Sequence, residues 1–312
     1  MAILRQCSFI GITILAMLVI LSSASAQPAS AHFTMLLPGD DLEVTAEDYI
    51  AELGNMVTLK ILWGHPFEHI MFDCPSTPDV HLRTPSGAMT VLSPSETTLD
   101  GNLAYEVSFI VEEIGDHIVY AELTAEEHGV VDHVKAIVHC GEEAWIGWEA
   151  ITDQNLEIIP YTRPYGLEPG FVFSGKAIWQ GGTEIAGATT EIEKYNTRSD
   201  GEALVAEAEL RFPEDPPMMF TRVTTTNGNG EFLYTLDEPG VWFIGVTVEA
   251  EDELDERAVI IVPVTTPFPE SSESGTAGPE DNSSGNTWAY VAFIVAAIAL
   301  ALGAFSLVYR RR

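Results

Sequence analysis

Histidine is the residue type in this chain best suited to metal chemistry, and all eight histidines lie between His32 and His139. Imidazole is a common ligand of borderline transition metals and titrates near neutral pH. His65 and His69 are four residues apart, so a helical turn between them would place their Cβ atoms about 5 to 6 Å apart on one face. Glu68 would then be an added ligand or a hydrogen-bond acceptor. This spacing predicts a metal site, and the alternative is a pair of structural or exposed histidines.

His117 and His139 form a second candidate pair, on two alternating runs that are expected to form a β-hairpin. If the turn at residues 126–129 sets Ala121 opposite His133, then His117 is a diagonal neighbour of His139, about 7 to 8 Å away, and the two could share an ion. His133 and His139 point to one face but are roughly 20 Å apart along the strand, at about 3.3 Å per residue. This distance is too long for the two side chains to share one metal ion.

His32 is a third candidate because two signal-peptide cleavage sites are possible, after Ala26 or after Ala31. Cleavage after Ala31 would make His32 the mature amino terminus, whose α-amino group and imidazole could together chelate copper or nickel. Cleavage after Ala26 would abolish that arrangement. His81 and His128 are expected to be loop histidines without a role.

Cys74 and Cys140 are the two cysteines expected in the exported protein, because Cys7 leaves with the signal peptide. An even pair in an oxidising compartment favours a disulfide, while free buried thiols or a thiolate ligand remain alternatives. No Gly-x-Ser-x-Gly elbow and no glycine-rich phosphate loop before a helix occurs, so we expect no enzyme activity and no catalytic residues.

The ends of the chain predict a membrane-anchored, outside-facing protein. Residues 1–31 have the basic, apolar and small-residue order of a signal peptide. Residues 288–309 are uncharged, with aromatic borders, and residues 310–312 are three arginines, which predicts one transmembrane helix and a short cytoplasmic tail. Residues 263–287 are rich in Pro, Ser, Gly and acids, which predicts a disordered stalk. The expected location is therefore the cell membrane, with an extracytoplasmic body.

The charge of the chain excludes a nucleic-acid partner. Asp and Glu number 47 against 14 Lys and Arg, for a formal net charge of −33. Phosphate would be repelled over such a surface, whereas cations would be concentrated near it.

Short β-branched and aromatic runs between turn residues predict an all-β fold. The clearest runs are residues 57–63, 105–111, 117–123, 130–140, 171–179, 232–236, 241–248 and 258–262. Histidine stops and the composition changes near residue 150, so we expect two immunoglobulin-like β-sandwich domains, at residues 32–153 and 154–262. The second, with its hairpin signal at Asn227–Gly230, resembles transthyretin-like or carboxypeptidase-regulatory-like sandwiches.

Three motifs together resemble the exported NikM-like family, which is associated with nickel and cobalt uptake systems of the energy-coupling-factor type. They are Ala31–Pro38, Trp63–His69 and Glu157–Gly166. The resemblance implies an extracytoplasmic accessory protein that binds or hands over Ni²⁺ or Co²⁺ to a permease, with His32, His65 and His69 as the matching positions. A structural or interaction protein of the cell envelope and a copper-binding protein that uses His32 are the alternatives.

Overall fold

The computed structural model describes residues 32–39, 42–213, 221–251 and 253–267. The expected signal peptide, the transmembrane helix, the cytoplasmic tail and all of the expected stalk beyond residue 267 lie outside the described residues. Among the residues that are described, no helix is both long and apolar enough to cross a membrane.

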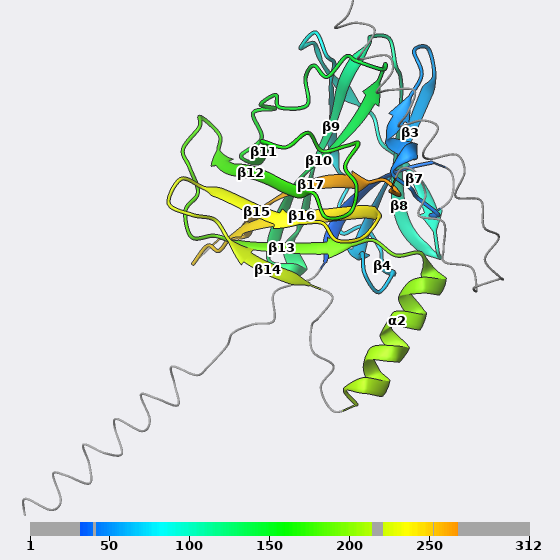
Figure 1. Cartoon of the computed structure of the whole chain (residues 1–312), viewed down its shortest axis with the longest axis vertical. Coiled ribbons are helices and arrows are strands. Elements are labelled where there is room, and N and C mark those ends of the chain that lie inside the picture. Colours follow the sequence, from blue (N-terminus) through cyan, green and yellow to red (C-terminus); the bar gives the residue numbers. More distant parts are fainter. Residues whose placement is uncertain (1–31, 40–41, 214–220, 252, 268–312) are drawn as a thin grey trace, which may run out of the picture. The chain divides into compact units, whose positions relative to one another are not determined.

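The described chain forms three β-sheets (Figure 1). The five-stranded sheet has the order β1-β3-β8-β7, with β4 paired to β3. Its strands are β1 (Phe33–Pro38), β3 (Met56–His65), β4 (Ile70–Phe72), β7 (Ser95–Leu99) and β8 (Asn102–Ile110). All its pairings are antiparallel.

The nine-stranded sheet has the order β14-β13-β16-β17-β10-β9-β5-β6, with β2 paired to β10. Its strands are β2 (Ile50–Ala51), β5 (Asp79–Arg83), β6 (Met89–Leu92), β9 (Gly115–Ala125), β10 (Val130–Cys140), β13 (Thr189–Lys194), β14 (Arg222–Thr225), β16 (Gly240–Val248) and β17 (Asp255–Val264). The three-stranded sheet consists of β11 (Leu156–Pro160), β12 (Val172–Trp179) and β15 (Glu231–Thr235). The described helices are η1 (Glu47–Tyr49), η2 (Glu126–His128) and α2 (Arg198–Arg211).

Two hydrophobic cores lie on the two faces of the central strands of the nine-stranded sheet. On β9, Val119 belongs to the core shared with β1, β3 and β8, whereas Ile118 belongs to the core shared with β11 and β12. On β17, Ile261 belongs to the first of these cores and Ile260 to the second. This follows from the strand period of two, which turns successive side chains to opposite faces. The strands are apolar on both faces because both faces are buried.

The two segments expected as separate sandwiches share this sheet. β10, from the first segment, pairs in parallel with β17, from the second, over Val130–Lys135 and Asp255–Ile260. Val241 and Phe243 of β16 lie in the core that β1 and β3 also line. The nine-stranded sheet and both cores therefore contain residues from both sides of the expected boundary at residues 153–154.

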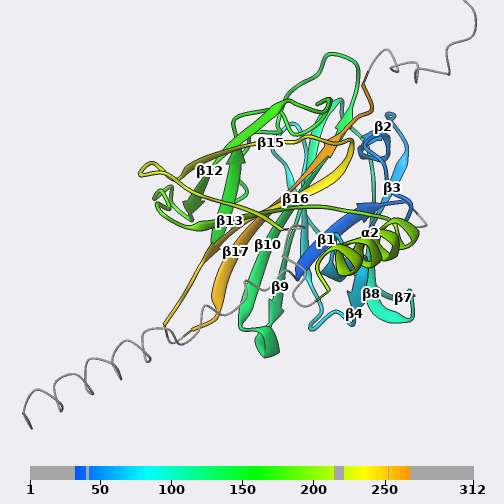
Figure 2. The ribbon, with the colours of Figure 1, turned by 60° about the horizontal axis from the view of Figure 1, so that its bottom comes forward.

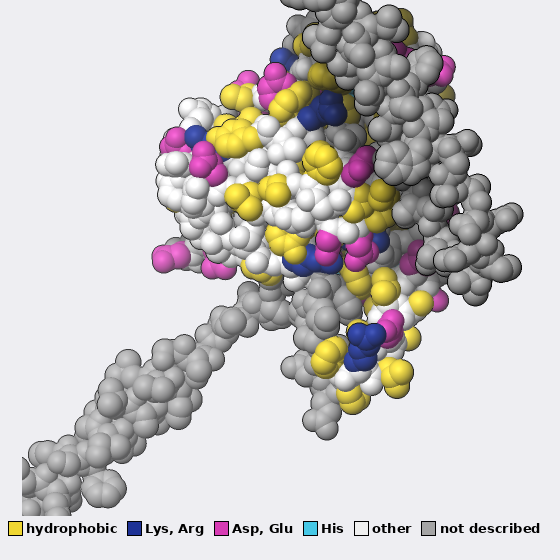
Figure 3. All heavy atoms as spheres, in the orientation of Figure 1, with side chains coloured by type: hydrophobic (Ala, Val, Ile, Leu, Met, Phe, Trp, Pro, Cys, Tyr) yellow, Lys and Arg dark blue, Asp and Glu magenta, His cyan; other side chains and the backbone are white. Residues whose placement is uncertain are grey.

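The eight runs expected as strands all overlap strands of the structure, and the mostly β fold is confirmed. The expectation that this part of the chain holds only strands is wrong at α2. Its residues are largely Ala, Glu, Leu and Arg, which favour a helix without the apolar stripe that sequence patterns detect. One contact of α2 is with the turn between β3 and β4, where a Cβ atom on Gly201 would meet the carbonyl oxygen of Glu68 at 2.7 Å. Figures 1 and 2 show the helix from two directions, and Figure 3 shows acidic and basic side chains on one face of the molecule.

Candidate functional site

Three histidines from distant parts of the chain meet at one end of the five-stranded sheet. The ring centroid of His32 lies 4.3 Å from that of His65 and 4.7 Å from that of His128. The His32 and His65 rings are nearly perpendicular, with 84° between their planes. We call His32, His65 and His128 the histidine cluster.

Aromatic side chains form the wall of the histidine cluster. The Trp63 ring is stacked on His32, with centroids 5.7 Å apart, and it also contacts His128. Phe72 contacts both His32 and His65. The cluster is therefore partly desolvated, and its rings are confined by packing on more than one side.

Strand pairing explains why these histidines come together. In the antiparallel register of β1 with β3, Phe33 is opposite Gly64, which places His32 beside the end of β3 where His65 lies. A Cβ atom on Gly64 would meet the carbonyl oxygen of Ile70 at 2.1 Å, so only glycine permits this approach of β4 to β3. His128 arrives from the η2 turn between β9 and β10, which Gly129 closes with a left-handed φ of 72°.

A buried ion pair fixes the start of β1. Arg257 donates to both carboxylate oxygens of Asp132, from Nε at 2.7 Å and from Nη2 at 3.0 Å, and also donates to the backbone carbonyl of His32. Asp132 in turn accepts hydrogen bonds from the backbone N–H of Thr34 at 2.9 Å and its hydroxyl at 2.8 Å. The His32 backbone is therefore anchored to β10 and β17.

The environment of His32 and His65 favours their neutral imidazole forms. Burial, together with the neighbouring His65, His128 and Arg257, lowers the pKa of His32 to about 4, against a smaller opposing effect of Asp132. Burial also lowers the pKa of His65, against an opposing effect of Glu68. Neutral imidazole is the form that binds metal ions.

Glu68 is a carboxylate close to His65 of the cluster. Its Oε2 atom lies 3.8 Å from Nδ1 of His65, beyond a normal hydrogen bond. Both Glu68 Oε2 and His65 Nε2 are buried without a hydrogen-bond partner among the described atoms. Within the described ranges, no group of three or more His, Cys, Asp or Glu side chains is already arranged to hold a metal ion.

A second buried acid lies close to Glu68. Glu193 of β13 is fully buried and accepts a hydrogen bond from Thr221 through Oε1, while its Oε2 atom has no partner among the described atoms. Burial, against the opposing hydrogen bond from Thr221 and together with the neighbouring Glu68 and Glu191, raises the pKa of Glu193 to about 8. Glu193 is therefore largely protonated at neutral pH.

His69 does not join His65, and the expected helical turn is wrong. Residues 66–69 form the turn of a hairpin in which His65 pairs with Ile70, and His69 has a positive φ of 53°. The ring of His69 is buried between the carbonyl oxygen of Asn196, 2.9 Å from Nδ1, and Oδ2 of Asp100, 3.0 Å from Nε2. Both ring nitrogens thus have protein partners.

His117 and His139 face opposite sides of their sheet, so the expected shared ion is wrong. The hairpin register is shifted by one residue, because Ala121 pairs with Val134 and not with His133. A shift of one residue reverses the face of every side chain. His139 accordingly pairs with Asp116, whose Oδ1 atom lies 2.7 Å from Nδ1, whereas His117 stacks on Phe109.

Cys74 and Cys140 are both buried free thiols in the structure, so the expected disulfide is not formed. Burial raises the pKa of Cys74 to about 12, and burial also raises that of Cys140. Protonated buried thiols are poor metal ligands and poor nucleophiles.

His128 is the cluster member that sequence reasoning missed, since it lies in a loop and in no histidine motif. The hairpin turn at residues 126–129 was nonetheless expected, and it places His128 at the end of β9 and β10. What the sequence does not indicate is which other strand ends lie beside that turn.

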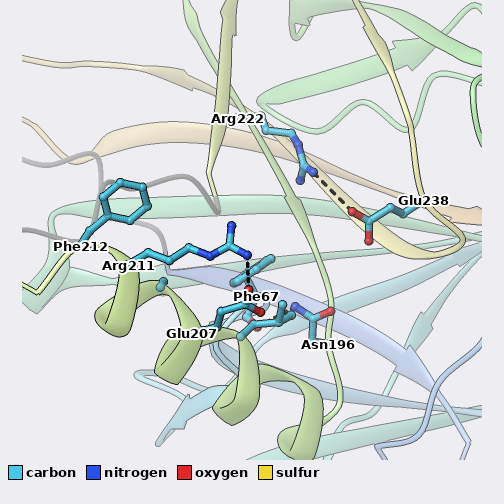
Figure 4. Close-up of a pocket in the computed structure, with 9 residues that line it drawn as sticks. Phe67, Asn196, Glu207, Arg211, Phe212, Arg222 and Glu238 are labelled. Carbon is cyan, nitrogen blue, oxygen red and sulfur yellow. Dashed lines mark hydrogen bonds and ion pairs between the residues drawn. The ribbon is translucent and has the colours of Figure 1, made fainter.

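A pocket of about 330 Å³ lies along α2 (Figure 4). Phe67, from the hairpin turn after His65, lines it together with Arg211 and Phe212. Arg211 pairs with Glu207 on α2, and on the side of the pocket away from α2 the Nη2 atom of Arg222 lies 3.9 Å from Oε1 of Glu238. The amide of Asn196 donates to the Phe67 carbonyl at 2.8 Å, so the segment before α2 is attached to the turn that carries Glu68.

Comparison with solved structures finds only distant similarity. A 1.5-MDa bacterial ice-binding adhesin is 12% identical, with 75% of this chain and 64% of that chain covered and a TM-score of 0.23. Salmonella alpha-2-macroglobulin is 11% identical, with 77% and 15% covered and a TM-score of 0.24. A DUF4785 family protein of Legionella pneumophila is 9% identical, with 70% and 53% covered and a TM-score of 0.26. The chain thus spans less than two thirds of each of these chains.

The search of curated proteins finds no match. The family model for the domain of unknown function DUF4198 matches residues 29–250, a segment that contains the whole histidine cluster and most strands of the three sheets. The chain therefore belongs to the DUF4198 family.

Proposed function

We propose that this protein is a membrane-anchored, extracytoplasmic accessory that binds a divalent transition metal, Ni²⁺ or Co²⁺, through the histidine cluster. The observation that carries the proposal is the convergence of His32, His65 and His128, with ring centroids 4.3 and 4.7 Å from that of His32. Two imidazole nitrogens on one ion lie within about 4 Å of each other. Ring separations of this size are compatible with a shared ion.

The chemistry of the donors supports the proposal. The low pKa of His32 and the lowered pKa of His65 keep both rings neutral, and the free Nε2 atom of His65 gives the ion an available donor. Imidazole suits nickel and cobalt, and the net negative charge of the chain concentrates cations. Because the side chains are not yet set around one point, binding must reorient at least one ring of the cluster.

The transport role rests on the resemblance to the NikM-like family and on the expected anchor at residues 288–309. In this proposal the protein delivers its ion to a nickel or cobalt permease in the same membrane. Copper is a second candidate ion, favoured by the central place of His32 in the cluster. An envelope protein without a metal is the competing function.

Metal titration of the purified full chain in detergent tests the proposal. Ni²⁺, Co²⁺, Cu²⁺ and Zn²⁺ are titrated separately into the wild type, His65→Ala and a matched control, His81→Ala. We expect one saturable Ni²⁺ or Co²⁺ site in the wild type and the control, and its loss in His65→Ala. Tight binding of Cu²⁺ alone would assign the copper function. The absence of a stoichiometric site for any of the four ions would leave the envelope function.

A further inference from the structure

A lysine and a glutamate are buried together between β10 and β11. Lys135 of β10 is 2% exposed, and Glu157 of β11 is 1% exposed. Lys135 lies two residues before Ile137, so its side chain points into the core to which Ile118 of β9 and Ile158 of β11 also belong. The Nζ atom of Lys135 donates to the Oε2 atom of Glu157. The two groups are therefore in contact at a place that is shielded from bulk water.

The two oxygens of the Glu157 carboxylate have unequal surroundings. Besides Lys135, the backbone N–H of Thr152 donates to Oε2 at 3.0 Å. The hydroxyl of Thr152 lies 3.0 Å from the same oxygen and 3.3 Å from Oε1 of Gln154. The Oε1 atom of Glu157 is buried and has no hydrogen-bond partner among the described atoms. Donors thus converge on one oxygen and leave the other without any.

The ammonium group of Lys135 is also incompletely paired. An ammonium group has three N–H donors. Among the described residues, Nζ of Lys135 has two acceptors, which are Oε2 of Glu157 and the backbone carbonyl of Ile158, 3.3 Å away. Burial lowers the pKa of Lys135, against the opposing effect of Glu157 and with a smaller contribution from Arg83. An ion pair here therefore leaves one buried donor and one buried acceptor without a partner, which is costly.

An amide between the two side chains would satisfy all of these groups. Its carbonyl oxygen, the present Oε2, would keep the donors of Thr152. Its single N–H would keep the Ile158 carbonyl as its acceptor. The Oε1 atom, which has no donor, would no longer be present. The hydrogen-bonding groups of the site therefore match an amide better than they match an ion pair.

We propose that Lys135 and Glu157 are joined by an isopeptide bond that forms within the folded protein. After one proton passes from Nζ to Oε1, the neutral amine attacks Cδ of Glu157, and the N–H of Thr152 stabilises the negative charge on Oε2. The Nζ–Cδ bond forms, the Cδ–Oε1 bond breaks, and a second proton from Nζ accompanies Oε1, which leaves as water. No other reactant is consumed. The fixed contact replaces a bimolecular encounter, and the exclusion of water opposes hydrolysis of the bond.

The bond joins β10 of the nine-stranded sheet to β11 of the three-stranded sheet. A covalent link between two strands restricts the unfolded chain and stabilises the fold, as a disulfide does. The described cysteines, Cys74 and Cys140, are free. The isopeptide bond therefore supplies a covalent cross-link that the cysteines do not.

Mass spectrometry of a tryptic digest of the purified full chain tests the proposal. Trypsin cleaves after lysine and arginine except before proline, so the uncondensed chain yields separate peptides over residues 84–135 and 136–176. Acylated Lys135 is not cleaved, so the condensed chain yields one peptide over residues 84–176, lighter by one water than its sequence. An ordinary missed cleavage leaves the full mass. The Lys60–Glu106 pair, whose glutamate side chain is 37% exposed, is the internal control and should not be condensed.

We expect the lighter peptide in the wild type, with fragments that place the link at Lys135 and Glu157. Lys135→Arg keeps the positive charge and the trypsin site and should yield only the two separate peptides. Glu157→Gln should yield a linked peptide of the wild-type mass, because loss of ammonia from glutamine leaves the same amide. A wild-type digest with only the two separate peptides, or with residues 84–176 at full mass, would overturn the proposal. This outcome does not depend on whether either variant folds.

Discussion

The rings of His32 and His65 meet edge to face, with centroids 4.3 Å apart, although one histidine precedes β1 and the other ends β3. The contact exists because β1 and β3 are antiparallel neighbours and because Asp132 and Arg257 anchor the backbone at His32. His69, four residues from His65, lies elsewhere and bonds Asn196 and Asp100. Position in the sheet, and not spacing in the sequence, therefore determines which histidines form the site.

His65→Ala and His69→Ala should have opposite effects. His65→Ala should abolish Ni²⁺ binding with little change in stability, since its Nε2 atom has no protein partner among the described residues. His69→Ala should leave metal binding intact and lower the free energy of unfolding by about 1 to 3 kcal/mol, because it removes a buried, doubly bonded ring. Calorimetric titration and chemical denaturation of both variants measure this difference. Equal metal loss in the two variants would contradict it.

Acid should destabilise the protein through His32. Its pKa is about 4 in the folded state against 6.5 ordinarily, so the unfolded state binds the proton more tightly. The stabilisation is complete above pH 6.5 and is lost as the pH falls from 6.5 towards 4. His32→Gln should weaken this dependence of Tm on pH. An unchanged pH profile in the variant would show that His32 does not titrate in this way.

Ionisation of Glu193 should make the stability of the protein fall as the pH rises, which is the opposite of the effect of His32. Its folded pKa of about 8 exceeds the ordinary value of 4.5, so the folded state holds the proton more tightly. Stability from this group is present below pH 4.5 and is lost as the pH rises from 4.5 to about 8. Glu193→Gln, which cannot ionise, should therefore have a higher Tm than the wild type at pH 8 and a similar one at pH 4.5. A Tm difference that is constant over this range would refute the assignment.

The Asp132–Arg257 pair should be essential for stability. Arg257 is only 2% exposed and Asp132 is fully buried, so Asp132→Ala leaves a buried guanidinium without its carboxylate. Breaking such a pair costs about 3 to 5 kcal/mol. Lys176→Ala breaks the exposed pair with Glu184 and should change the free energy of unfolding far less. Urea denaturation of the two variants provides the comparison, and similar losses would contradict the buried-pair assignment.

The strands were predictable from the sequence because β-branched and aromatic runs between turn residues are a local signal. The register of the β9–β10 hairpin was not, because the length of the η2 turn decides it and an error of one residue moved His117 to the wrong face. The sharing of one sheet by both halves depends on the parallel pairing of β10 with β17, which joins Val130 to Asp255. Such distant contacts leave no local pattern.

The candidate site was only partly predictable, because motifs are local signals whereas contacts between distant strand ends are not. His32 and His65 stood out by their motifs, but His128 enters only through the position of the turn after β9. His69 was misleading because the HxxxH spacing implies a helix, whereas the glycine at position 64 allows β4 to return along β3 as a hairpin.

X-ray absorption spectroscopy of the Ni²⁺-loaded full chain shows whether the histidine cluster holds the ion, because it reports the ligand atoms of the metal. We expect at least two imidazole ligands in the wild type and one fewer in His128→Ala, with no change in His81→Ala. A spectrum with oxygen ligands only, or one that His128→Ala leaves unchanged, would contradict a metal site at the histidine cluster.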